Sequence, residues 1–282
     1  MKKSPHQEQF LQILSRDAAE AAFLDALQPQ PLGIEPVPLA ALAGRVLAQD
    51  IAAPVDAPPF DRATVDGFAV RAADLSDASA SEPARLRLNA ETIACGMAPA
   101  LTVKPGTATT IATGAPLPRG ADAVVMIEHT DPEGDGITVS RALAPGSHVS
   151  FAGSDIARGQ TLLRKGSLIS AREVAMLAAV GLDGAPVWRK PRVAVLSTGD
   201  ELVQPGQPLR PAAVYDSNGP VIAAALRENG CEGVHLGAVA DTAEALSAAV
   251  RSAFNEYDAL ILSGGTSKGA GDLTTQVIAG LC

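Results

Sequence analysis

The amino-acid sequence predicts a multidomain α/β protein, and three observations support this fold class. Beyond Pro191, strand-like and helix-like segments alternate, which indicates an open, mostly parallel α/β sheet domain. Between residues 56 and 156, strand-length apolar runs are separated by Gly, Pro and Asp turns, which favours a small β-rich domain. Helical and extended segments outside these two regions indicate a third, elongated N-terminal α/β domain.

The N-terminal domain is expected to be discontinuous, formed by residues 1–55 and 157–190. Apolar residues at helical spacing predict an amphipathic helix over 6–27, which Pro29 and Pro31 end. Further expected elements are a short helix over 39–47, an extended segment over 48–53 and a helix over 171–179 that Gly181 closes.

The β-rich domain is expected to occupy residues 56–156. Its predicted strands are 68–70, 86–88, 107–111, 123–127 and 137–139. The last domain, 191–282, follows a strand–helix order. Its predicted strands are 193–196, 233–239 and 259–262, and its predicted helices are 220–228, 243–254 and 273–281. This order predicts parallel strands joined by crossover helices.

Charge and composition exclude several classes of protein. The 282 residues carry a formal net charge of −9, and binding to a phosphate backbone requires a basic face, so we expect no nucleic-acid partner. No apolar run reaches the roughly 18 residues of a membrane-spanning helix, and no secretory signal is visible at the N-terminus. Cys95, Cys231 and Cys282 show no paired spacing, which favours a reduced setting. A soluble, cytoplasmic protein is expected.

Polar residues follow each predicted strand of the last domain. In an open parallel sheet, ligands bind beyond the carboxyl ends of the strands, so these residues are expected to meet at one edge. They are Ser197, Thr198, Gly199 and Glu201 after the first strand, Asp241 after the second, and Gly264, Gly265, Ser267 and Lys268 after the third, with Tyr215, Asp216, Ser217 and Asn218 before the first helix.

The glycine-rich segment 264–271 is the strongest single indication of ligand contact. Four glycines lose much chain entropy on ordering, and such loops present N–H groups to anions. The segment matches neither the G-x-x-x-x-G-K-[ST] nor the G-x-G-x-x-G fingerprint. A phosphate-bearing ligand held in another geometry, with carboxylates near for a metal, is therefore the open possibility.

Each of these features also has a purely structural explanation. Asp241 and Asp272 suit helix caps, Ser217 and Asn218 suit the cap of the helix before Pro220, and Asp200-Glu201 suits a solvated loop. Asp66-Gly67 suits a hairpin turn, and the stretch from Thr113 suits a turn-rich loop.

Six motifs in order resemble one family, the molybdopterin molybdotransferases, which include the MoeA proteins and the gephyrin E domain. The motifs are DAPPFDRATVDGFAV, IATGAPLPRGADAVVMIE, GSDIARG, PRVAVLSTGDELVQPG, YDSNG and ILSGGTSKGAGDL. The resemblance covers nearly the whole chain. It implies that the last domain is a sheet domain of the molybdopterin-binding type.

The resemblance implies an activity: the insertion of molybdate into adenylylated molybdopterin with release of AMP, dependent on Mg²⁺ or another divalent metal. It implies catalytic roles for Asp66, Glu201, Asp241 and Asp272, with Asp272 and Glu201 holding the metal. Ligand contacts are expected from Thr113, Asp155, Ser197, Thr198, Gly199, Asp216, Ser217, Asn218, Gly264, Gly265, Ser267 and Lys268. A homodimer is implied, in which the β-rich domain of one subunit faces the sheet domain of the other. Other cofactor-biosynthesis proteins are possible partners.

The sequence departs from the family's pattern in several places. Thr266 and Lys268 stand in the glycine-rich loop, Gly219 stands where an Arg commonly follows D-[ST]-N, and Phe68 and Val65 replace Tyr and Met. Family members continue with two P-G-x-P loops and a further β-rich domain, so the sheet domain is expected to be incomplete here. Two alternatives stay open: a non-catalytic binding or scaffold protein of the same fold, and an unrelated nucleotide-dependent enzyme that does not need Asp66.

Overall fold

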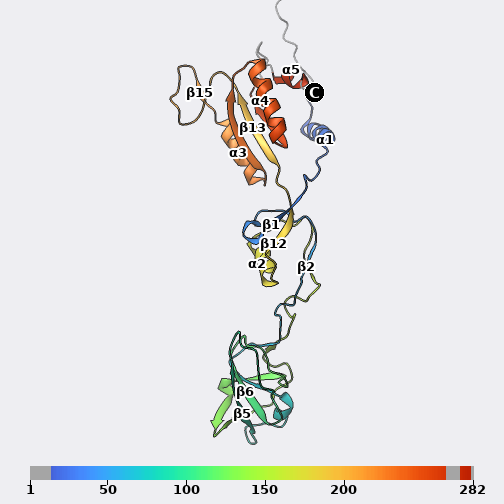
Figure 1. The fold of residues 1–282 in the computed structure, drawn as a ribbon, viewed down its shortest axis with the longest axis vertical. Helices are drawn as coiled ribbons and strands as arrows, with labels where there is room; N and C mark the ends of the chain where they lie inside the picture. The colour runs from blue at the N-terminus through green and yellow to red at the C-terminus, as the bar shows by residue number, and fades with distance from the viewer. Residues whose placement is uncertain (1–13, 265–273, 281–282) are drawn as a thin grey trace, which may run out of the picture. The chain divides into compact units, whose positions relative to one another are not determined.

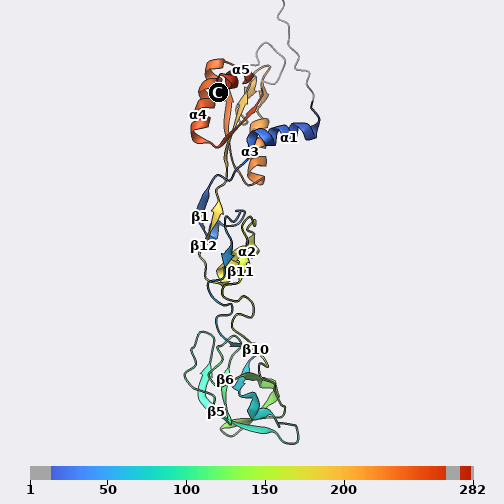
Figure 2. The ribbon, with the colours of Figure 1, turned by 90° about the vertical axis from the view of Figure 1, so that its right-hand side faces the viewer.

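The computed structural model describes residues 14–264 and 274–280 (Figures 1 and 2). These residues form two compact units. One comprises residues up to 36, 44–48 and from 186 onward, and the other comprises 37–43 and 49–185. None of the described helices is long and apolar enough to cross a membrane.

The second unit is built on a six-stranded sheet in the order β7-β4-β6-β5-β9-β8. Its strands are β4 (Gly67–Val70), β5 (Ala84–Ile93), β6 (Thr107–Ile111), β7 (Ala123–Met126), β8 (Thr130–Glu133) and β9 (Gly136–Val139). All neighbours are antiparallel except β5 and β6, which are parallel. The prediction of a β-rich region is confirmed, although the predicted strand over 86–88 extends over ten residues as β5.

Both faces of this sheet are buried at its β4–β7 side. Phe68 and Val125 belong to one hydrophobic cluster, whereas their neighbours Ala69 and Val124 belong to a second cluster. Successive side chains of a strand point to opposite faces, so both faces carry apolar packing here. This explains why these strands are short continuous apolar runs without polar alternation.

Three two-stranded sheets and several short helices complete this part of the chain. The sheets pair β1 (Ile34–Pro38) with β12 (Gly184–Trp188), β2 (Ile51–Ala52) with β11 (Thr161–Leu163), and β3 (Arg62–Ala63) with β10 (Val149–Ser150). The 3-10 helices are η1 (Leu39–Ala41), η2 (Ala72–Leu75) and η3 (Ile127–His129). Helix α2 (Ala171–Ala179) has the predicted bounds, and Ser170 with Glu173 forms a capping box at its start.

Two predicted helices at the N-terminal end need correction. The predicted helix over 39–47 is wrong beyond Ala41, because Gly44 adopts a left-handed backbone with φ 76° and Leu47 forms a β-bridge with Val187. The predicted helix over 6–27 is observed as α1 (Arg16–Leu27), which begins after Ser15 because that side chain accepts a hydrogen bond from the Ala18 N–H. Residues 6–13 of that prediction lie outside the described part.

The first unit contains a parallel three-stranded sheet in the order β16-β13-β17. The strands are β13 (Arg192–Thr198), β16 (Glu232–Val239) and β17 (Ala259–Ser263), and both pairings are parallel, as predicted. The helices are α3 (Asn218–Glu228), α4 (Ala243–Glu256) and α5 (Thr274–Ala279). A short parallel pair, β14 (Leu202–Val203) and β15 (Val214–Tyr215), was not predicted.

Helices cover both faces of the parallel sheet, with α3 on one side and α4 on the other (Figure 2). On the α4 side, Leu196 packs with Leu246, Val250 and Val277 in a buried cluster. This packing buries both faces of β13, whose residues from Val193 to Thr198 are all buried. Strand β13 is therefore packed between helices on both faces, as in other parallel sheets.

Candidate functional site

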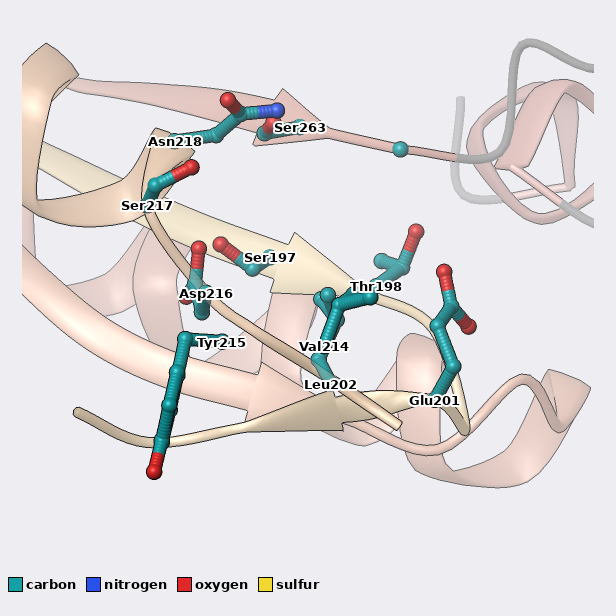
Figure 3. Close-up of a pocket in the computed structure, with 11 residues that line it drawn as sticks. Ser197, Thr198, Glu201, Leu202, Val214, Tyr215, Asp216, Ser217, Asn218 and Ser263 are labelled. Carbon is teal, nitrogen blue, oxygen red and sulfur yellow. The ribbon is translucent and has the colours of Figure 1, made fainter. Parts of the chain in front are cut away.

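A pocket of about 260 Å³ opens beyond the carboxyl ends of β13 and β17 (Figure 3). Its lining residues are Ser197, Thr198, Glu201, Leu202, Val214, Tyr215, Asp216, Ser217, Asn218, Ser263 and Gly264. The prediction from strand ends placed Ser197, Thr198, Glu201, Asp216, Ser217, Asn218 and Gly264 at one edge, and all of them line this pocket.

Tyr215, which was also expected at this edge, lines the pocket, whereas three lining residues were missed by the sequence analysis. Leu202 and Val214 belong to the short β14–β15 pair, and strands of two residues are too short to show a periodicity. Ser263 is the last residue of β17, one position beyond the predicted strand end. Ser263 directly precedes Gly264, the first residue of the predicted glycine-rich loop, and this position could have identified it from the sequence.

Two hydroxyl groups at the end of β13 lie buried at this pocket. Ser197 is 1% exposed and Thr198 6% exposed, and neither hydroxyl oxygen has an aligned hydrogen-bond partner among the described residues. A buried hydroxyl without a partner costs free energy, and a bound polar ligand would remove that cost. These two groups are therefore the clearest ligand-binding atoms in the described part of the pocket.

The backbone of Gly264 passes directly over Thr198. A Cβ atom at Gly264 would lie 2.4 Å from the Thr198 carbonyl oxygen and 2.6 Å from its hydroxyl oxygen, and the φ of Gly264 is 113°. Only glycine fits this approach. The first glycine of the predicted loop is thus required by its contact with β13, whereas Gly265, Ser267, Lys268 and Asp272 lie outside the described residues.

The start of α3 is capped by Asp216, not by the residues after it. The Gly219 N–H donates to Asp216 Oδ1 over 3.0 Å, whereas Ser217, the N-cap residue, makes no side-chain cap bond. The structural explanation of Ser217 as a helix cap is therefore wrong. Ser217 and Asn218 line the pocket instead, and Asn218 is already the first residue of α3.

Asp216 is a buried carboxylate with a histidine side chain beside it. It is 3% exposed, and His235 Nε2 lies 2.9 Å from its Oδ2, without the alignment of a hydrogen bond. Burial alone would raise the pKa of Asp216, but the Gly219 N–H, the Ser197 hydroxyl and His235 together lower it below its ordinary value. The carboxylate is consequently kept ionised beneath the pocket.

Glu201 lines the pocket, whereas Asp241 lies at the same end of the sheet without lining it. The Asp241 N–H donates to Asp200 Oδ1 over 3.2 Å, which joins the segments that follow β13 and β16. Thr242 is the N-cap of α4, since its hydroxyl accepts from the Ala245 N–H. The explanation of Asp241 as the helix cap is therefore wrong. Gly199 does not line the pocket either.

In the other unit, Asp66 and Thr113 lie together. The N–H and the hydroxyl of Thr113 both donate to Asp66 Oδ1, over 2.7 and 2.8 Å. The backbone bond, followed by the hydroxyl bond, lowers the pKa of Asp66. The hairpin explanation of Asp66-Gly67 is wrong, because the flanking strands β3 and β4 pair with other strands and not with each other. Asp155 is exposed, and its N–H bonds to the Ala57 carbonyl.

The expected metal ligands are only partly described. Within residues 14–264 and 274–280, no group of three or more His, Cys, Asp or Glu side chains is arranged to hold a metal ion. Glu201 points its carboxylate toward the pocket on the side of Thr198 (Figure 3). It is an exposed oxygen donor of the kind that Mg²⁺ prefers, while its expected companion, Asp272, lies outside the described residues.

Fold and site define a class of protein: a parallel α/β domain that carries a polar pocket at its carboxyl edge, together with a separate β-rich unit. A family described as "MoeA N-terminal region (domain I and II)" matches residues 14–181, and one described as "Probable molybdopterin binding domain" matches 194–282. The chain belongs to the MoeA family. The alternative of an unrelated enzyme on a similar sheet is therefore wrong.

The curated relatives in this comparison are named molybdopterin molybdenumtransferases. A molybdopterin molybdenumtransferase 2 of Mycobacterium tuberculosis is 41% identical over 83% of this chain and 58% of its own length. A molybdopterin molybdenumtransferase of a Nostoc species is 37% identical over 100% of this chain and 66% of its own length. The corresponding Bacillus subtilis protein is 39% identical over 83% of this chain and 55% of its own length. The chain thus spans less than two thirds of the length of these relatives.

Solved structures agree with the fold. A molybdopterin biosynthesis MoeA protein from Pyrococcus horikosii is similar with a TM-score of 0.83 and 41% identity, over 93% of this chain and 66% of that one. A second MoeA structure from Pyrococcus horikoshii OT3 has a TM-score of 0.75 and 36% identity, over 82% of this chain and 62% of that one. The predicted multidomain α/β class is confirmed.

Proposed function

We propose that this chain acts in molybdenum cofactor biosynthesis, as the part of a molybdopterin molybdenumtransferase that binds adenylylated molybdopterin, with insertion of molybdate and release of AMP. One observation carries the proposal. In a chain of the MoeA family, the buried hydroxyls of Ser197 and Thr198 have no aligned hydrogen-bond partner among the described residues, and they line a polar pocket at the carboxyl ends of the strands of a parallel sheet. This edge is where open α/β sheets bind ligands.

The residues of the pocket have distinct roles in this proposal. Ser197 and Thr198 donate hydrogen bonds to phosphate or ribose oxygens, which satisfies their own buried hydroxyls. Ser217 and Asn218 contribute polar groups from the start of α3, at the end where a helix favours anions. Together these groups bind and orient the ligand, which is the main task of a protein in phosphate chemistry.

A divalent metal, Mg²⁺ in our proposal, would be held by Glu201 and Asp272. Such an ion would supply positive charge next to the phosphate oxygens of the ligand. Glu201 lines the pocket and is exposed, so its carboxylate is free to serve as a ligand. Asp241 lies at the same end of the sheet and is proposed as a further acidic residue of the reaction.

The second part of the proposal concerns assembly. We infer that the chain works as a homodimer in which Asp66, Thr113 and Asp155 of one subunit complete the pocket of the other. The support is that Thr113 holds the Asp66 carboxylate in one exposed position, as a contact residue for a ligand requires. The reaction is placed in the cytoplasm, with small-molecule substrates and no nucleic-acid partner, in keeping with the acidic composition.

A second function, a non-catalytic binding or scaffold role, is supported by one observation. The described pocket is lined largely by hydroxyl, amide and carboxylate groups, which suit the binding of a polar ligand. Binding without transfer is the outcome expected if these groups only hold the ligand.

One assay separates the two functions. The purified chain is incubated with adenylylated molybdopterin, molybdate and Mg²⁺, and AMP release is measured together with ligand binding. Transfer predicts AMP release that falls at least about 100-fold in Thr198→Val, because the donor to the charged oxygen is lost. Binding without AMP release would support the scaffold role. A folded chain that does not bind the ligand would contradict both functions.

A further inference from the structure

One close contact between a histidine and a buried carboxylate lies at the described pocket. Asp216 is 3% exposed, and His235 Nε2 lies 2.9 Å from its Oδ2. A buried carboxylate is costly unless other groups hold its charge. Each oxygen of Asp216 is held from a different element: Oδ1 by the Gly219 N–H of α3 and Oδ2 by the imidazole of β16.

The position of His235 shows that Asp216 is the acidic group against its ring. His235 lies on the face of β16 that α3 covers, the same face as Gly233, which packs against the α3 backbone. The charged residues of α3, Arg227 and Glu228, lie at the opposite end of that helix. The charged residues of α4 lie across the sheet, because α4 packs on the other face.

The imidazole ring also explains why position 219 carries no side chain. A Cβ atom at Gly219 would lie 2.1 Å from His235 Nε2 and 2.4 Å from its Cδ2. In this chain the space next to Asp216 is filled from the neighbouring strand, by a side chain that can also carry a positive charge.

We propose that His235 is a positioning residue that fixes the Asp216 carboxylate and, through it, the start of α3 and the Ser217–Asn218 side of the pocket. The consequence for ligand binding rests on the proposed function, whereas the placement of Asp216 does not.

The structure links these groups in one short chain of contacts. The imidazole holds Oδ2, the carboxylate accepts the Gly219 N–H, and this bond closes the first turn of α3. Ser217 lies within that turn and makes no cap bond of its own, so its orientation depends on Asp216. Loss of the His235 imidazole removes the contact at Oδ2 and lets the buried carboxylate turn away from the helix, which opens the bond to Gly219.

The test measures hydrogen exchange of the Gly219 amide in the full chain without ligand. We expect His235→Ala and His235→Phe to speed this exchange about tenfold or more, while the amides of β17 keep their rates. Phe preserves the ring volume without the charge, so it separates positioning from packing. The double variant His235→Ala/Gly219→Arg restores slow exchange, because removal of the ring makes room for the arginine. His129→Ala, at an exposed histidine, is the control.

Two outcomes would overturn the proposal: a Gly219 exchange rate in His235→Phe equal to that of the unmodified chain, or no recovery in the double variant. Should His235→Ala fail to fold, His235→Gln replaces it, since the amide keeps a donor but no charge, and fast exchange is still expected. Binding of AMP, measured by calorimetry on the same variants, is expected to weaken in parallel. If the unmodified chain binds no AMP, the proposed function fails, while the exchange rates still decide the role of His235.

Discussion

Asp66 Oδ1 accepts both the N–H and the hydroxyl of Thr113, over 2.7 and 2.8 Å, although the two residues are 47 positions apart. The contact joins the segment before β4 to the segment after β6. Strands β4 and β6 are antiparallel neighbours in the six-stranded sheet. Two motifs that looked like separate turns in the sequence are therefore one polar unit at the ends of two central strands of that sheet.

Thr113→Val is expected to raise the pKa of Asp66 part of the way to its ordinary value. The hydroxyl bond is lost, but the backbone N–H bond, the larger cause of the lowered pKa, remains. The pKa is measured by carboxyl NMR during a pH titration. Thr130→Val is the control, because its hydroxyl donates to a carbonyl and not to Asp66. An unchanged pKa of Asp66 in Thr113→Val would show that the hydroxyl does not hold the carboxylate.

Gly264→Ala is expected to destabilise the first unit and to abolish ligand binding. A left-handed alanine costs about 1–2 kcal/mol, and the collision with Thr198 adds about 1–3 kcal/mol. The matched control is Gly230→Ala, which has a similar backbone with φ 83° and no atom within 4 Å of the new Cβ. Urea unfolding measures both variants. Equal losses of unfolding free energy would mean that Thr198 yields to the new methyl group.

Asp258→Asn is expected to lower the unfolding free energy by about 1 kcal/mol. Asp258 receives two bonds from Arg189 and one from the Arg192 N–H, and the first two are the main cause of its lowered pKa. Because the pKa is lowered on folding, this stability is present above the unfolded pKa and is lost as the pH falls through the folded one. The loss therefore begins below about pH 4.

The comparison for Asp258 is the ion pair of Arg85 and Glu133, which is exposed on both sides and 3.5 Å long. Glu133→Gln is expected to change the unfolding free energy by less than about 0.5 kcal/mol. If Asp258→Asn changes the unfolding free energy equally little at pH 7, or if its effect on that free energy is the same at low pH, the two Arg189–Asp258 hydrogen bonds contribute nothing to stability.

Leu246→Ala is expected to cost about 2–5 kcal/mol of unfolding free energy, because it opens a cavity between α4 and β13. Val221→Ala on α3, where the side chain is 60% exposed, is expected to cost less than about 0.5 kcal/mol. Chemical denaturation compares the two. A small loss in Leu246→Ala would indicate that α4 closes over the vacated space.

The carboxyl edge of the parallel sheet was predictable from residue order. Buried strands such as Val193–Leu196 are continuous apolar runs, and in a parallel sheet their carboxyl ends meet on one side, so the residues that follow them share one rim. This placed Ser197, Thr198 and Gly264 together. The helix predicted over 39–47 failed because Leu47 pairs with Val187, a partner 140 residues away that no local pattern reveals.

The sequence by itself determined the alternation of strands and helices, the polar rim and the resemblance to one family, because these depend on local spacing and on motif order. Only the tertiary structure decided which side chains contact one another. Asp216 caps α3 instead of Ser217, and His235 fills the space that Gly219 leaves, because long-range packing brings β16 against the start of α3. Such contacts depend on distances between segments, and the linear order of residues does not contain those distances.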